Sequence, residues 1–135
     1  DRPTDYREAG RNFRPWWSAV SGLIVAAIFT QAVFAGLMLS GVEWARVAHS
    51  ANAVVLIAST LIAGLVAAVT LRRVAHGPNL IFTLLSLALA VSLQTAIGKS
   101  SAEGANLMWI HIPLGVALVG FAAQAVAAAR RLGGA

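Results

Sequence analysis

The sequence predicts an all-α fold, an integral membrane up-down four-helix bundle built from two repeated helical hairpins. The first observation is composition, because 59% of the 135 residues are hydrophobic and only 11% are charged. Soluble domains have roughly 45–50% apolar and 25% charged residues, so a chain this apolar belongs in a lipid bilayer. The second observation is a set of four long apolar runs joined by short loops. The third is an internal repeat that relates the two halves of the chain.

The N-terminal segment, residues 1–15, is polar and carries four Arg residues. We predict that it is a cytoplasmic tail and that the first membrane helix opens at Pro15, since proline is well tolerated at the start of a helix. Trp16 and Trp17 follow directly. Paired aromatic residues at this point predict an anchor at the level of the lipid headgroups.

Four membrane helices are predicted after this tail. Each has close to the roughly 20 residues that are needed to cross about 30 Å of hydrocarbon. Because the loops are short, sequential helices are expected to be antiparallel neighbours. The helices are rich in Ala, Gly and Ser, which allow close helix packing in lipid. The predicted ranges are 16–39, 47–71, 79–97 and 107–129, and residues 130–135 form a cytoplasmic C-terminal tail.

Basic residues are distributed unevenly between the two sides of this predicted bundle. Eight of the ten Lys and Arg residues fall in the N-terminal tail, the middle loop and the C-terminus. The other two, Arg46 and Lys99, lie in the first and third predicted loops. Cytoplasmic segments carry the excess of positive charge, so both termini are expected in the cytoplasm. The Arg-, Ala- and Gly-rich composition suggests a bacterial protein, and we expect it in the cytoplasmic (inner) membrane.

The internal repeat consists of a Gln late in one apolar helix and a His early in the next. Gln31 precedes His49 by eighteen residues, and Gln94 precedes His111 by seventeen. In both copies a Gly and a short polar loop lie between them. The two His are therefore expected at similar depth near the outer face, pointing at each other across the bundle. Each heads a face of mostly small residues: Ala53, Leu56, Thr60, Ala63 and Ala67 after His49, and Gly115, Leu118, Ala122 and Ala125 after His111.

Two imidazoles at matched depth on facing helices can supply both axial ligands of a haem iron. The repeat therefore predicts one bis-His haem b. Ala53 and Gly115, one turn deeper, would leave room for the flat macrocycle, and Arg46 and Lys99 would pair with its propionates. In the alternative, both His lie at the membrane interface and hydrogen-bond to backbone or water without a cofactor.

The two Gln residues also allow two interpretations. The favoured one is that Gln31 and Gln94 join neighbouring helices by hydrogen bonds, as amides do in membranes. The other is that they orient the ligand imidazoles through the second ring nitrogen. His76 lies in the middle loop with no partner His at that side, so the sequence does not predict a second bis-His site.

Several classes of function are disfavoured by residue type alone. The absence of cysteine excludes disulfides, thiolate metal sites and covalent haem attachment through CxxCH. The basic residues form no continuous patch that could follow a phosphate backbone, which argues against nucleic-acid binding. No Ser-His-Asp set, carboxylate cluster or glycine-rich phosphate loop is present in the sequence.

The positions of His49 and His111, and the run LQTAIG at residues 93–98, resemble one four-helix half of the haem A synthase family. The resemblance implies His ligands at the outer ends of the second and fourth helices. The chain also resembles small uncharacterised four-helix membrane proteins of actinobacteria. The chain departs from the family in lacking loop cysteines and in carrying Glu43 six residues before its His. It also has half the family's length, so that only a homodimer would rebuild eight helices.

Three functions follow from these observations. The first is a small b-type cytochrome-like membrane protein that holds one haem for local electron transfer or haem handling. The second is a cofactor-free accessory or assembly subunit of a larger membrane, for example respiratory, complex. The third is a membrane enzyme that modifies haem or a quinone, with Glu43 as the acid.

Overall fold

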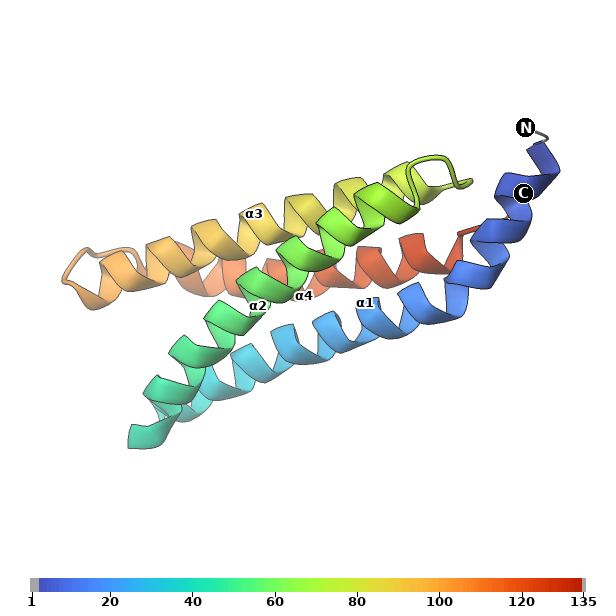
Figure 1. The fold of residues 1–135 in the computed structure, drawn as a ribbon. Coiled ribbons are helices and arrows are strands. Elements are labelled where there is room, and N and C mark those ends of the chain that lie inside the picture. The colour runs from blue at the N-terminus through green and yellow to red at the C-terminus, as the bar shows by residue number, and fades with distance from the viewer. Residues whose placement is uncertain (1–2, 135) are drawn as a thin grey trace.

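The computed structural model describes residues 3–134, the side chains from Asp5 onward, and contains four α-helices (Figure 1). Each helix packs against two others, so that α1, α2, α3 and α4 follow one another around a bundle. The predicted all-α four-helix bundle is therefore confirmed. The helices are α1 (Pro3–Leu39), α2 (Glu43–Thr70), α3 (Gly77–Ala102) and α4 (Met108–Arg130).

The α1–α2 and α3–α4 turns have the same backbone structure. In the first, the N–H of Gly41 donates to the carbonyl of Met38 and the N–H of Val42 donates to that of Leu37. In the second, Gly104 and Ala105 donate to the carbonyls of Ser101 and Ser100, respectively. This pair of bonds is the Schellman motif, and both glycines have the positive φ that it requires. The internal repeat thus extends to the turns that close the two hairpins.

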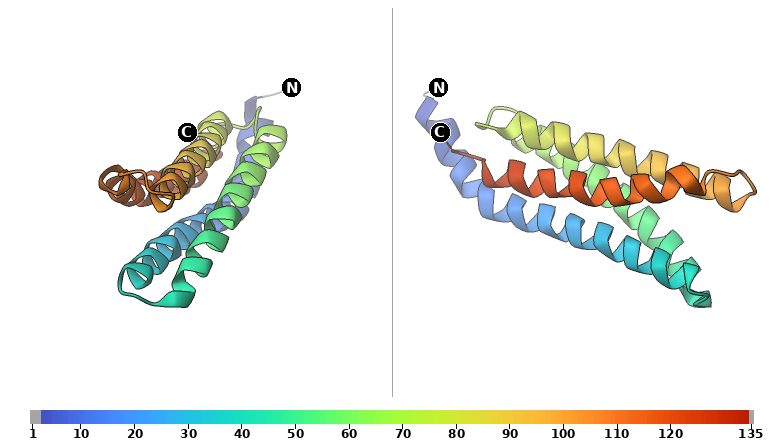
Figure 2. Two further views of the ribbon diagram at one scale, coloured as in Figure 1. Left: turned by 90° about the vertical axis from the view of Figure 1, so that its left-hand side faces the viewer. Right: turned by 180° about the vertical axis from the view of Figure 1, so that it is seen from behind.

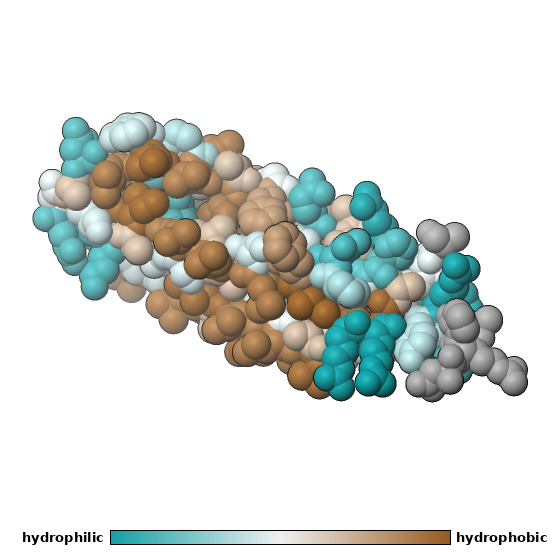
Figure 3. All heavy atoms as spheres, turned by 90° about the horizontal axis from the view of Figure 1, so that it is seen from above, coloured by the Kyte–Doolittle hydropathy of each residue, from teal (hydrophilic) through white to brown (hydrophobic). Residues whose placement is uncertain are grey.

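All four helices are long and apolar enough to cross a membrane, which indicates a multi-pass membrane protein. Figure 3 shows hydrophobic atoms over the middle of the molecule and hydrophilic atoms gathered at both ends. We call the end with the turns at 40–42 and 103–107 the hairpin end. We call the end with both termini and the loop at 71–76 the terminal end.

Two of the four predicted helix starts are wrong. α1 begins at Pro3 and continues through Pro15, so the helix does not open at Pro15. The preceding turns dock on the C-terminus, where a Cβ atom added to Gly10 would overlap the backbone of Gly133. Figure 1 shows a bend in this N-terminal part of α1, and a proline within a helix explains such a bend. α2 begins at Glu43 rather than at residue 47, because the chain resumes helical geometry directly after the turn.

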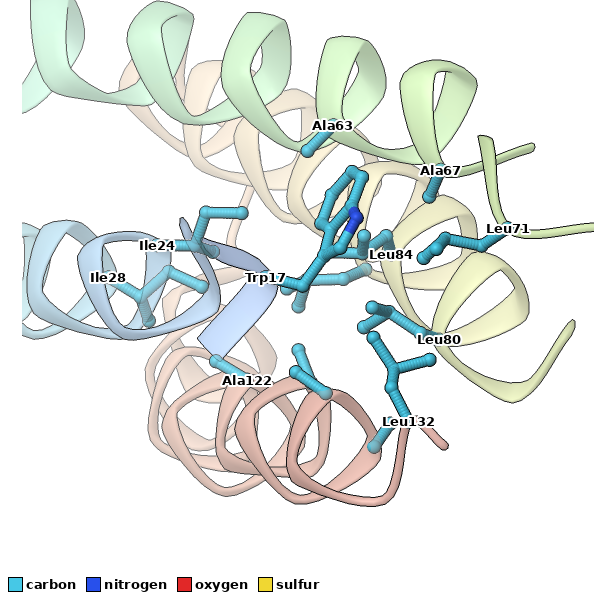
Figure 4. Packing of buried hydrophobic residues seen from close by; sticks show 14 of the residues in the cluster. Trp17, Ile24, Ile28, Ala63, Ala67, Leu71, Leu80, Leu84, Ala122 and Leu132 are labelled. Atoms are coloured by element: carbon cyan, nitrogen blue, oxygen red, sulfur yellow. The ribbon is translucent and has the colours of Figure 1, made fainter. Parts of the chain in front are cut away.

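The apolar core lies mostly towards the terminal end (Figure 4). Its largest member is Trp17, which is only 2% exposed and points towards Ala63 of α2 and Leu84 of α3. The expectation that Trp17 is an interfacial anchor is therefore wrong, whereas Trp16 is 67% exposed. The two side chains differ because neighbouring residues point to different sides of a helix.

The two hairpins separate towards the hairpin end. Figures 1 and 2 show the α1–α2 turn and the α3–α4 turn lying apart in all three views. Burial follows the same gradient, since α1 has no buried residue after Ile28 and α3 has none after Val91. The repeated Gln and His residues lie in this loosely packed half.

Candidate functional site

Each hairpin is joined by the same hydrogen bond between its Gln side chain and its His backbone. Gln31 Nε2 donates to the carbonyl oxygen of His49 at 3.0 Å, across α1 and α2. Gln94 Nε2 donates to the carbonyl oxygen of His111 at 2.6 Å, across α3 and α4. Both Gln side chains therefore join neighbouring helices, as favoured from the sequence. The repeat in the sequence is a repeat of this contact.

The imidazole of His49 is oriented by the backbone of α1. Its Nδ1 lies 3.2 Å from the carbonyl oxygen of Gln31. A carbonyl oxygen only accepts, so this bond requires the proton on Nδ1 and leaves a lone pair on Nε2. A backbone carbonyl is a common partner for the second nitrogen of a metal-bound His. The orienting role considered for the Gln31 side chain is thus filled by its main chain.

The imidazole of His111 lies over the backbone of Gly98. A Cβ atom added to Gly98 would be 2.6 Å from His111 Cε1, so a larger residue would force the ring to move. His111 Nδ1 is buried and has no hydrogen-bond partner in the described part of the chain. A buried polar atom without a partner is costly and requires an explanation. The ring is therefore positioned by packing alone, in contrast to that of His49.

The two His residues come from different hairpins, His49 from α2 and His111 from α4, and both are half-buried. The Nε2 atom of His111 lies beside Gly98 of its own hairpin, since a Cβ atom added to Gly98 would be 3.1 Å from it. His49 is six residues from the start of α2 and His111 three from the start of α4, whereas two and four were expected. The earlier start of α2 accounts for this difference.

The small-residue faces below the two His point inwards as predicted. On α2, Ala53, Leu56, Thr60, Ala63 and Ala67 are all buried. On α4, Ala122 and Ala125 are fully buried, and Gly115 and Leu118 are partly covered. The space beside Gly115 is filled by the Gln94 side chain, because a Cβ atom on Gly115 would be 3.2 Å from Gln94 Nε2. Its small size therefore makes room for the Gln94 amide within the same hairpin.

Sequence reasoning missed Asn52, which completes the polar network of the first hairpin. Its Nδ2 donates to Gln31 Oε1 at 2.7 Å and to the carbonyl of Ala27 at 3.1 Å. The signal was available, because Asn52 follows His49 by three residues and so shares its helix face. Counted from His111, the corresponding position is Leu114, and Gln94 Oε1 is buried without a partner among the described residues. The two hairpins therefore share the hydrogen bond from Gln to the His backbone, but only in the first does the Gln side-chain oxygen also accept a hydrogen bond.

Replacing Asn52 by Leu is expected to destabilise the protein by about 1–2 kcal/mol, because Gln31 Oε1 would lose its donor. The reciprocal variant Leu114→Asn offers Gln94 Oε1 the donor that the second hairpin lacks, and it should be neutral or stabilising. Unfolding by SDS in mixed micelles measures both. An Asn52→Leu variant as stable as the parent would show that this network does not hold the hairpin.

Gly98→Ala and Gly36→Ala form a matched pair at equivalent places in the repeat. An added methyl at Gly98 meets the His111 ring, whereas one at Gly36 meets nothing within 4 Å. We expect Gly98→Ala to cost about 1–3 kcal/mol through overpacking. Gly36→Ala should gain up to about 1 kcal/mol from helix propensity. Thermal unfolding in detergent separates them, and equal effects would contradict the contact between Gly98 and His111.

The charged residues predicted to pair with propionates lie near the two His but do not contact them. Arg46 is exposed in the first turns of α2, beside a hollow of about 200 Å³ that Glu43 also lines. Lys99 is exposed in the last turn of α3 and lies 4.0 Å from Glu103. Such an exposed pair contributes little to stability. Both cations thus remain available to an anion at the hairpin end.

The remaining polar candidates do not join the site. His76 lies in the loop between α2 and α3 at the terminal end, with a positive φ of 62°. In residues 3–134 no group of three or more His, Cys, Asp or Glu side chains could hold a metal ion. A haem iron needs only two ligands from the protein, because the porphyrin supplies the others. The site can therefore offer two imidazoles, one from each hairpin.

Comparisons with protein-family models, with curated proteins and with solved structures found no match for this chain.

Proposed function

We propose that this chain is a small b-type cytochrome-like protein that binds one haem between His49 and His111, for local electron transfer or haem handling. The observation that carries the proposal is the pair of half-buried imidazoles in repeat-equivalent positions. His49 has its Nδ1 engaged by a backbone carbonyl, which places the lone pair of the neutral ring on Nε2. This is the arrangement in which His presents a lone pair to a metal.

Two further features fit the group. Core packing weakens towards the hairpin end, so a planar cofactor there would add contacts that the side chains of the two hairpins do not supply themselves. The exposed cations Arg46 and Lys99 lie at the same end, within one helical turn of the His side chain or of its packing partner Gly98. There they can attract the carboxylates of a haem. When bound, a bis-His haem supplies one-electron transfer, with a potential set by burial and by hydrogen bonds to its ligands.

We further propose that the protein lies in the bacterial cytoplasmic membrane with both termini in the cytoplasm. Eight of its ten basic residues belong to the terminal end, and the positive-inside rule places that end in the cytoplasm. The His pair would then lie near the outer face, and electrons would be exchanged there rather than across the bilayer.

A cofactor-free accessory or assembly subunit is the second candidate. The low burial of α1 and α4 favours this function, because only 11% and 17% of their most apolar stretches are buried within the chain. These faces can receive helices of a second copy or of a larger membrane complex. An enzyme that modifies haem or a quinone is weaker, since Glu43 is exposed and two helical turns away from His49.

Haem content of the purified protein tests the proposal. The protein is expressed with added haem precursor, purified in detergent and assayed for haem type and haem per chain. We expect one haem b per chain, and none in the double variant His49→Ala/His111→Ala prepared in parallel. A colourless parent protein that co-purifies with other membrane subunits would replace this proposal with the accessory-subunit function.

A further inference from the structure

A second hollow lies far from the His pair, where the start of α3 meets the end of α4 at the terminal end. It has a volume of about 210 Å³, and its lining includes Asn79, Phe82 and Thr83 from α3, Gln124 from α4 and Arg131, which directly follows α4. Phe82 is 74% exposed, and Asn79, Gln124 and Arg131 are exposed as well. The hollow therefore opens on the outer surface of the bundle.

Gln124 is the most informative residue of this hollow. It lies almost two helical turns before Arg130, so it is about 9 Å further into the membrane-spanning part of α4. Its side chain is exposed at the surface of the bundle. An amide that faces hydrocarbon without a partner is expensive. A ligand at this surface that accepts hydrogen bonds would remove that cost.

The groups along the hollow follow an order that matches one class of ligand. Arg131 lies at the end of the helix, and Asn79 is in the first turn of the antiparallel α3. Phe82, Thr83 and Gln124 come next at similar depth, followed by the apolar helix surfaces. A phospholipid presents a phosphate, then ester carbonyls, then acyl chains. The cation, the hydrogen-bonding side chains and the apolar helix surface thus lie in the order of that molecule's parts.

The first hairpin has no equivalent of this site. Counted from the repeated His and Gln, the positions that correspond to Gln124, Arg131 and Asn79 are Ile62, Val69 and Trp16. All three are exposed and apolar, at 60%, 76% and 67%. At these three positions, polar groups therefore occur in only one of the two hairpins. Helix stability and solubility do not explain that difference, because both hairpins cross the same bilayer.

We propose that this hollow binds the headgroup of an anionic phospholipid, with Arg131 on the phosphate and Gln124 at the level of the ester carbonyls. The inference depends on membrane insertion and is independent of haem binding. Charge supports it, because Arg72, Arg73 and Arg130 share the terminal end and attract anionic lipid to this surface. Arg131 has no carboxylate partner among the described residues.

Native mass spectrometry of the detergent-purified full chain tests this site. Phosphatidylglycerol and phosphatidylcholine are added in turn, and the fraction with one bound lipid is measured. The parent should prefer phosphatidylglycerol, and Arg131→Gln should lower its affinity roughly fivefold, about the contribution of one basic residue near anionic lipid. Arg130→Gln removes the same charge beside the hollow and should change affinity less than twofold. Arg131→Lys should retain most of the preference, and Gln124→Leu should weaken binding of both lipids.

Three outcomes would overturn the proposal. Equal losses in Arg130→Gln and Arg131→Gln would show diffuse attraction without a site. Displacement of the lipid by glycerol 3-phosphate would assign the hollow to a free phosphate ester. A dimer that forms as lipid is removed, and that Gln124→Leu disrupts, would show that a second copy of the chain covers this surface.

Discussion

Substitution of either His49 or His111 by Ala is expected to abolish haem retention. Each variant removes one of two axial ligands, and the remaining ring cannot hold the iron in a bis-His site. His49→Ala also removes the hydrogen bond between His49 Nδ1 and the carbonyl oxygen of Gln31, which are 3.2 Å apart. Haem per chain after detergent purification measures the effect, and we expect a fall from one to near zero in both variants.

His76→Ala is the matched control for this experiment. It removes the same side chain from the loop between α2 and α3, at the opposite end of the bundle. We expect the parent haem content in this variant. Full haem retention by both His49→Ala and His111→Ala would exclude them as ligands, whereas loss in His76→Ala alone would move the site to the terminal end.

Trp17→Ala is expected to cause the largest loss of stability among single substitutions outside the site. Trp17 is 2% exposed and packs at the centre of the core in Figure 4. Truncating a buried Trp costs about 3–5 kcal/mol in water-soluble cores. Part of that cost is transfer from water, which lipid-embedded helices do not share, so roughly 2–4 kcal/mol is expected here. Unfolding in SDS and detergent mixtures measures the change.

The neighbouring residue supplies the control. Trp16 is 67% exposed, and Trp16→Ala removes the same side chain without opening a cavity. Exposed substitutions of this kind usually change stability by less than about 0.5 kcal/mol. Equal losses in the two variants would contradict the burial of Trp17 and would restore the pair as a membrane anchor.

Most of the fold could be predicted because hydropathy and loop length leave few alternatives. Four apolar runs of membrane-crossing length with short connections specify an antiparallel bundle. The burial of Trp17 was also available from the sequence, since Trp17, Ser21, Ile24 and Ile28 recur at helical spacing and all four are buried. The start of α1 at Pro3 could not be predicted from such a pattern. It depends on the contact between Gly10 and Gly133, which are distant in the chain.

The sequence allowed the residue pairs of the candidate site to be predicted, but not the individual contacts that position the two His rings. The repeat of Gln and His revealed which residues cross-link each hairpin. It did not reveal that the Gln31 main chain would hold His49, or that Gly98 would make room for His111. Such contacts depend on the angle at which two helices cross, and that angle follows from packing over the whole interface.

The optical spectrum of the detergent-purified protein, oxidised and then reduced with dithionite, tests the central claim most directly. Low-spin haem between two imidazoles gives a sharp Soret band, with resolved α and β bands on reduction. We predict this spectrum for the parent protein and its loss in His49→Ala and His111→Ala. A flat visible spectrum, unchanged when haem is supplied during expression, would contradict the proposal and would leave the His pair as residues that pack the two hairpins.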